Sequence, residues 1–167
     1  TAEWGFNQSG VSAGAVYADV DNDGDLDLIV NNTNEISGVY KNNSERKKDN
    51  NYLKIILKGD ASNPSGIGSK VTLYCKGEKY FQEQQPVRGF QSSVDPNLNF
   101  GIGSNDMIDS IRVIWPNDRT ELIKAVKPQQ TITVNINNAT ETWQYLKTDT
   151  VQKYFVADSL SFRHREN

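Results

Sequence analysis

The sequence predicts an all-β protein in which a hairpin unit precedes a β-sandwich or barrel-like domain. Apolar residues fall in short runs, and several runs alternate apolar and polar residues as half-buried strands do. Gly, Pro, Asn and Asp cluster between the runs, where they favour turns. No segment carries a sustained period of 3.6 residues, so long amphipathic helices are not expected. Many short strands with regular turns are typical of sandwiches and barrels.

The first unit covers residues 1–50. Val11–Val20 and Leu26–Asn32 are β-type runs on either side of an aspartate-rich stretch, and SGVYKNN at 37–43 is a third candidate strand. The segment SERKKDNN at 44–51 is charged and has no apolar anchor. It is therefore expected to be a linker or an exposed loop.

The second unit covers residues 51–137 and consists of further strand candidates separated by turns. In the last of them, Ile132, Val134 and Ile136 share one face while polar residues share the other. Residues 138–167 are expected to be a tail or a linker to a following module, with a short helix as an alternative near its start. The candidate strands lie at 52–58, 70–75, 79–87, 98–103, 110–116, 120–126 and 131–136.

The charge distribution narrows the classes of partner. The net charge is -3, although the aspartates between positions 19 and 27 alone contribute five negative charges, so the acidity is local. Without a basic stripe nucleic-acid binding is not expected, and without an apolar run of about 18 residues no membrane span is expected.

Cys75 is the only cysteine, which excludes an intrachain disulfide and a thiolate zinc site. Because the chain begins with Thr1, we expect a piece of a longer protein.

The stretch DVDNDGDLD places an aspartate at every second position. Its spacing, D-x-D-x-D-G-x-x-D, offers carboxylates at positions 1, 3, 5 and 9 of a short loop, and calcium takes about six to eight oxygen ligands. Gly24 permits a sharp bend, which would direct the following backbone carbonyl at the ion. In the predicted calcium site Asp25 acts through that carbonyl and the others through side chains. The predicted ligands are Asp19, Asp21, Asp23, Asp25 and Asp27.

The flanks of this stretch distinguish it from an EF-hand. An EF-hand loop needs a Glu at its twelfth position and helical flanks, whereas Val30 stands there and the flanks are β-like. A solvated acidic turn or a magnesium site are the alternative interpretations. Repulsion among crowded carboxylates favours a divalent cation, which removes it. Leu26, Leu28 and Val30 are expected to face one core side and Ile29 the other, so that the following strand is buried on both faces.

The segment GVSAGAVYADVDNDGDLDLIVNN resembles the FG-GAP/VCBS type of repeat, which forms blades of integrin-like β-propellers. The resemblance spans roughly Trp4 to Asn43 and implies that the loop binds calcium between two strands. It also implies neighbouring repeats of the same chain, because a lone blade cannot bury both faces of its sheet. A single unit must therefore pack on the second unit or lack its neighbours.

The second unit resembles the ASPIC/UnbV domain. The segments that carry the resemblance are NYLKIILKG, the run from PSGIGSK to FGIGS, and DSIRVIWPNDRTELI, and the pair FGIG and VIWPNDR is the most specific part. Such domains accompany FG-GAP/VCBS-type repeats in the cartilage acidic protein family and in many bacterial surface proteins. The resemblance implies a slice of a large bacterial secreted or outer-membrane protein, located extracellularly, at the cell surface or in the periplasm.

Four residues outside the aspartate stretch are candidates for recognition: Trp4, Arg88, Phe90 and Trp143. The two tryptophans could stack on sugar rings. Arg88 and Phe90 lie in PVRGFQSS, which is expected to be a surface loop. Trp115 ends an apolar strand and is instead expected to pack in the core.

The expected function is that of a non-catalytic, calcium-binding module that binds or scaffolds outside the cytoplasm, for example in adhesion. Calcium is expected to be structural, and the partner is an unknown protein or glycan. Catalysis is not expected, because the only histidine, His164, lies between two arginines and nothing in the sequence places an acid and a nucleophile beside it. One alternative is a carbohydrate-binding module in bacterial glycan capture, and the other is an accessory domain of an enzyme.

Overall fold

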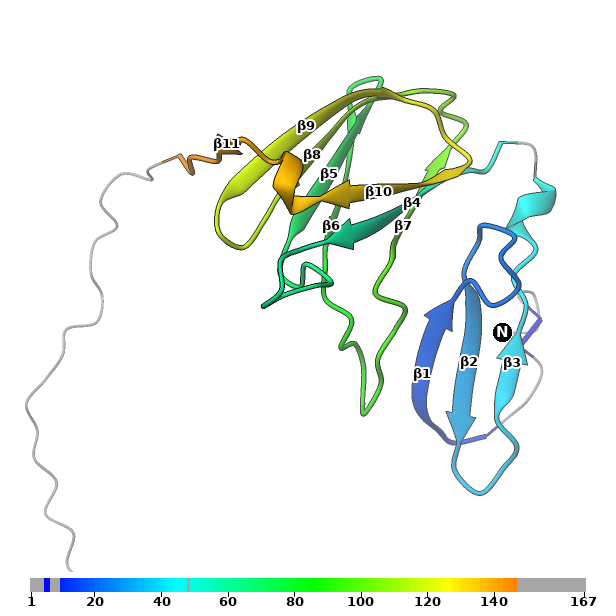
Figure 1. Ribbon diagram of the computed structural model, residues 1–167. Helices are drawn as coiled ribbons and strands as arrows, with labels where there is room; N and C mark the ends of the chain where they lie inside the picture. The colour runs from blue at the N-terminus through cyan, green and yellow to red at the C-terminus, as the bar shows by residue number, and fades with distance from the viewer. Residues whose placement is uncertain (1–4, 7–9, 48, 147–167) are drawn as a thin grey trace, which may run out of the picture.

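The computed structural model describes residues 5–6, 10–47 and 49–146, and the fold is all-β as predicted (Figure 1). In the first unit three antiparallel strands form one sheet in the order β1-β2-β3, and a 3-10 turn, η2 (Ser44–Arg46), leads out of it. These strands are β1 (Ser12–Ala18), β2 (Asp27–Asn32) and β3 (Gly38–Tyr40). None of the helices in the described residues has the length and apolar character that crossing a membrane requires.

The second unit is a sandwich of two open sheets. The smaller sheet has the order β10-β4-β7 and the larger sheet the order β11-β9-β8-β5-β6. Pairing is antiparallel throughout the larger sheet, whereas β10 runs parallel to β4 in the smaller one. The strands are β4 (Asn51–Lys58), β5 (Lys70–Cys75), β6 (Glu78–Glu83), β7 (Leu98–Gly103), β8 (Ile108–Ile114), β9 (Arg119–Val126), β10 (Gln130–Asn135) and β11 (Glu141–Thr142).

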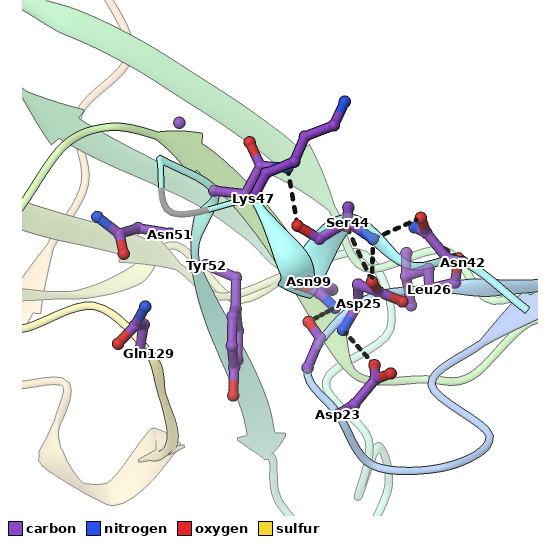
Figure 2. Close-up of a pocket in the computed structure, with 14 residues that line it drawn as sticks. Asp23, Asp25, Leu26, Asn42, Ser44, Lys47, Asn51, Tyr52, Asn99 and Gln129 are labelled. Carbon is purple, nitrogen blue, oxygen red and sulfur yellow. Dashed lines mark hydrogen bonds between the residues drawn. The ribbon is translucent and has the colours of Figure 1, made fainter.

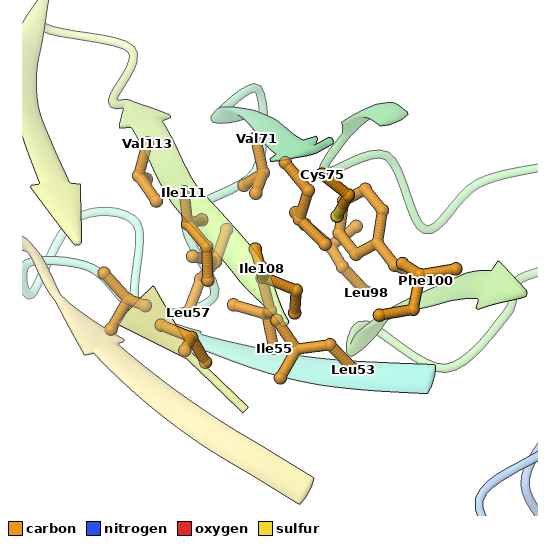
Figure 3. Close-up of a cluster of buried hydrophobic side chains, with 14 of the residues drawn as sticks. Leu53, Ile55, Leu57, Val71, Cys75, Leu98, Phe100, Ile108, Ile111 and Val113 are labelled. Atoms are coloured by element: carbon orange, nitrogen blue, oxygen red, sulfur yellow. The ribbon is translucent and has the colours of Figure 1, made fainter. Parts of the chain in front are cut away.

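The hydrophobic core lies between the two sheets of the sandwich (Figure 3). Strand β4 contributes Leu53, Ile55 and Leu57, and alternate residues of β5 and β8 meet them from the larger sheet. Each fully buried side chain of this kind stabilises the fold by about 1.5–3 kcal/mol. Trp115 is 1% exposed and belongs to this core, as its position at the end of an apolar strand predicts.

The start of the tail packs back on the sandwich. After β10 the chain forms a 3-10 turn, η3 (Ile136–Asn138), and β11 then pairs with β9 and forms one edge of the larger sheet. The backbone N–H of Trp143 donates to the carbonyl of Asp118 at 2.7 Å. Up to residue 146 the described tail contains no α-helix, so the helix alternative is not found there. Residues 147–167 lie outside the described part of the chain.

The hairpin sheet is less buried than the sequence predicts. Leu28, Ile29 and Val30 of β2 are half-buried instead of being covered on both faces. One face is approached by the loop between β6 and β7, where the carbonyl of Phe90 would lie 3.2 Å from a Cβ placed on Gly14. The strand after the aspartates therefore belongs to a thin, partly shielded sheet and not to a two-sided core.

Candidate metal site

The aspartate loop, residues 19–27, joins β1 to β2 at the end of the hairpin that faces the sandwich (Figure 1). Two residues turn its backbone, since Asn22 has a φ of 60° and Gly24 a φ of 99°. Asparagine tolerates this left-handed region and glycine adopts it without a steric penalty. The bend predicted at Gly24 is therefore present.

Three carboxylates of the loop converge. Asp19, Asp21 and Asp23 each offer an oxygen, and these oxygens all lie within 4.8 Å of one another. Two oxygens bound to one calcium ion are at most about 5 Å apart, because each Ca–O distance is about 2.3–2.6 Å. The spacing of the three oxygens therefore fits a shared divalent cation.

Asp19 is the most deeply buried member of this group. Its side chain is 4% exposed, and its Oδ1 is buried without a hydrogen-bond partner among the described residues. Its Oδ2 lies 3.4 Å from Nζ of Lys54, which extends from β4. A buried carboxylate oxygen without a partner has lost its hydration without compensation. A bound cation would supply the missing interaction.

Lys41 partly neutralises the exposed side of the group. Its ammonium contacts Oδ2 of Asp21 and lies 3.1 Å from Oδ2 of Asp23. The hydrogen bond to Asp21 is the main cause that raises the pKa of Lys41 above its ordinary value. Burial acts to raise the pKa of Asp23, but hydrogen bonds from Lys41 and from the N–H of Asp25 outweigh it and the pKa is lowered. Asp23 therefore stays ionised near neutral pH, as a metal ligand must.

The other two predicted ligands use their carboxylates to brace the loop. Asp27, which is 3% exposed, accepts hydrogen bonds from the N–H groups of Val20 at 3.0 Å and Asn42 at 2.8 Å. Oδ2 of Asp25 accepts from both the N–H and the hydroxyl of Ser44, each at 2.9 Å. Among the described residues, neither carboxylate belongs to the convergent group of three.

Residues of the sandwich hold the loop from the other side (Figure 2). The ring of Tyr52 on β4 packs so tightly on Gly24 that a Cβ there would lie 2.3 Å from it. Nδ2 of Asn99 on β7 donates to the carbonyl of Gly24 at 3.1 Å. Together with Lys54, these side chains stand on the face of the smaller sheet that points away from the core. Sequence reasoning missed them, because outward residues of a strand normally face solvent.

The structure describes three of the four recognition candidates and places them on two different parts of the second unit. Trp4 lies outside the described residues. Arg88 donates to the carbonyl of Gln85 in its own loop at 3.0 Å and to that of Glu83 at the end of β6 at 3.4 Å, and Phe90 on the same loop is 67% exposed. Trp143 is half-buried, with the guanidinium carbon of Arg112 5.6 Å from its ring centroid. Trp143 is therefore already in contact with the sandwich on the side of the larger sheet.

Comparison with known proteins bears on the second unit. Residues 59–141, about half of the chain, match the model of the family described as ASPIC and UnbV. The match begins after β4 and does not include the aspartate loop. A search of curated proteins found no match. The resemblance of the second unit is thereby confirmed, whereas that of the first unit stays a prediction. Residues 59–141 of this chain are an ASPIC/UnbV domain.

Proposed function

We propose that this chain is a non-catalytic, calcium-binding module in which calcium holds an FG-GAP/VCBS-type hairpin against an ASPIC/UnbV domain. The observation that carries the proposal is the convergence of Asp19, Asp21 and Asp23, together with the unpartnered oxygen of Asp19. Calcium would neutralise these carboxylates and so stabilise the loop conformation that Tyr52 and Asn99 contact. Its role is structural.

Further ligands can come from the remaining aspartates of the loop. A carboxylate oxygen has more than one lone pair, so Asp27 can accept an N–H and still bind a metal. The backbone carbonyl of Asp25 is the other proposed ligand, and its side chain is already held by Ser44. Calcium suits such a crowded set of oxygens better than magnesium, which usually keeps several waters and binds one or two carboxylates.

The proposed location is outside the cytoplasm, in a secreted, cell-surface or periplasmic protein. Calcium sites of extracellular modules have Kd values of about 10⁻⁴–10⁻³ M, so they fill where calcium is millimolar. The proposed role is binding or scaffolding, with an unidentified protein or glycan and neighbouring repeats of the same chain as partners. Exposed apolar residues on the hairpin sheet, such as Val39 at 68%, support the neighbouring repeats.

Calorimetric titration of the calcium-free chain tests the metal site. We expect calcium to bind with a Kd of about 10⁻⁴ M and magnesium to bind more weakly. Asp21→Asn and Asp23→Asn should each weaken calcium binding by about tenfold or more, because each removes a charged ligand. At 100 times its Kd, calcium would stabilise the folded loop by about 2.7 kcal/mol.

Lys41→Met provides a variant that should act in the opposite direction. Removal of the ammonium leaves Asp21 and Asp23 to the metal alone, so calcium affinity should rise several-fold while the loop becomes less stable in EDTA. Lys47→Met is the control, since it removes the same charge from an exposed residue nearby with no ion pair among the described residues. A wild-type chain that binds no calcium would contradict the proposal, as would aspartate variants with unchanged affinity.

A further inference from the structure

We propose that the cavity between the aspartate loop and the outward face of the smaller sheet binds a neutral, polyhydroxylated ligand, a short saccharide. The cavity has a volume of about 620 Å³, within the range of about 300–1,000 Å³ usual for small-molecule sites. Residues 23–26 form one wall, and β4 and β7 form the other, with Gln129 beside them (Figure 2). The inference rests on the proposed binding function and names its ligand class.

Three asparagines, two of them adjacent at the start of β4 and one on β7, present fixed amides to this cavity. Asn50, Asn51 and Asn99 each donate Nδ2 to a backbone carbonyl, at 3.1, 3.0 and 3.1 Å respectively. These bonds hold the amides in place, while their oxygens accept no hydrogen bond within the described residues. The side chain of Gln129 is exposed, and neither its amide NH2 nor its amide oxygen makes a hydrogen bond within the described residues. The cavity therefore combines fixed acceptors with an adaptable donor and acceptor, which complements the hydroxyl groups of a sugar.

Tyr52 adds an aromatic surface to the same cavity. One side of its ring lies against Gly24, and Figure 2 shows the ring standing between the aspartate loop and Gln129. The face of an aromatic ring is electron-rich and attracts the C–H groups of a sugar ring. Gly101 and Gly103 of β7 also line the cavity, and their lack of side chains leaves the space beside that strand open.

The remaining lining residues disfavour other classes of ligand. Leu26 is the only large aliphatic side chain among them, so an apolar ligand would bury little matching surface. Among the described lining residues the two carboxylates of Asp23 and Asp25 outnumber the one cation, Lys47, which disfavours a phosphate or another anion. Both carboxylates already have partners within the first unit, so the cavity does not demand a cationic ligand either.

A glycan array probed with the whole chain in 10 mM calcium tests the inference, followed by titration of the best-binding oligosaccharide. We expect neutral oligosaccharides to bind, and Gln129→Gly to weaken binding by about five- to tenfold through lost hydrogen bonds. Gln129 has a φ of 57°, so glycine adds no strain there. Gln91→Gly is the matched control, because Gln91 is also exposed and has a φ of 47°, yet does not line the cavity. It should bind as the wild type does.

The possible failures can be told apart. An array without hits would overturn the saccharide site, and so would binding only to a parallel peptide array. Equal losses of glycan binding in the two glutamine variants, or a loss of glycan binding in Trp143→Ala alone, would overturn it as well. Calcium is titrated separately, without glycan. Calcium binding without any glycan binding defeats this inference alone, whereas cavity-dependent glycan binding without calcium binding defeats only the proposed role of calcium.

Discussion

Gly24 is constrained both by its own backbone and by a neighbour from the other unit. Its φ of 99° lies in a region that residues with a Cβ rarely adopt. The ring of Tyr52 also occupies the space that a Cβ would need. The spacing of the aspartates explains the first constraint but not the second. Gly24 thus couples the bend of the aspartate loop to its packing on β4.

Gly24→Ala should therefore do more damage than the same substitution at Gly77. Gly77 has a φ of 88° with open space around it, so alanine there costs only backbone strain of about 1–2 kcal/mol. At Gly24 the strain is joined by displacement of Tyr52, and calcium affinity should fall by about tenfold. Titration of calcium measures this difference, and Tyr52→Ala added to Gly24→Ala should restore part of the affinity. Equal calcium affinity in the two glycine variants would refute the coupling.

The ligands of the candidate site could be predicted because they are neighbours in the sequence, whereas their cationic partners could not. Nine residues contain every proposed metal ligand, so the spacing alone indicates the chemistry. Lys41 follows β3 and Lys54 lies within β4, and a single lysine in such a position resembles any solvated charge. The contacts of Lys41 depend on how β3 returns beside the loop, and that of Lys54 depends on how the hairpin meets the sandwich. Local patterns encode neither.

The strands of the sandwich could be predicted from their alternation, but their pairing could not. Strand β4 buries every second residue, as the pattern of YLKIILK indicates. Alternation shows which face is buried without showing which strand lies alongside, so the parallel pair of β4 and β10 was not predictable. In β2 the continuous apolar run Leu28–Val30 indicates that both faces of the strand are shielded from solvent, but it does not indicate how completely. Phe6, with its ring centroid 4.7 Å from that of Tyr40, shields only part of one face.

One carboxylate accepts several hydrogen bonds in the connection between β4 and β5. Oδ1 of Asp60 accepts hydrogen bonds from the hydroxyl of Ser62 at 2.6 Å, from its N–H at 2.9 Å, and from the N–H of Asn63 at 3.0 Å. These bonds, that of the Ser62 hydroxyl above all, lower the pKa of Asp60 below 3.8. The folded state thus favours the ionised form. Asp60 stabilises the fold above pH 3.8, and this contribution is lost as the pH falls through the folded pKa.

Asp60→Asn should consequently lower the melting temperature of the sandwich at neutral pH and have less effect in acid. The difference from the wild type should shrink as the pH falls below 3.8, because the wild-type carboxylate is then protonated as well. Thermal unfolding at a series of pH values measures it. Asp118→Asn is the control, since Asp118 is exposed in a turn of the same unit and its side chain accepts no hydrogen bond among the described residues. A difference that is constant with pH would exclude the ionised carboxylate as its cause.

The described residues of the two units do not share a hydrophobic core. The cluster of buried apolar side chains runs from Leu53 to Ala139 and includes no described residue of the first unit. The units meet instead through the contacts of Lys54, Asn99 and Tyr52 with the aspartate loop, and where the loop between β6 and β7 approaches Gly14 of β1. Most of the burial that stabilises the sandwich is therefore independent of the loop and of any metal that it binds.

Chelation of calcium should accordingly open the first unit and leave the sandwich folded. In EDTA, trypsin should cut after Lys41 and Arg46 faster than in calcium, because the loop that braces this segment has lost its cation. Cys75 has no exposed surface, and burial above all raises its pKa, so its thiol should react slowly with a disulfide reagent until the sandwich unfolds.

Labelling of Cys75 along a urea series should then give the same midpoint with and without calcium, while the trypsin cuts respond to calcium. If calcium removal lowered the urea midpoint of Cys75 labelling as well, the units would unfold as one cooperative body. The contact between Tyr52 and Gly24 would then transmit the free energy of calcium binding into the sandwich, in spite of the separate cores.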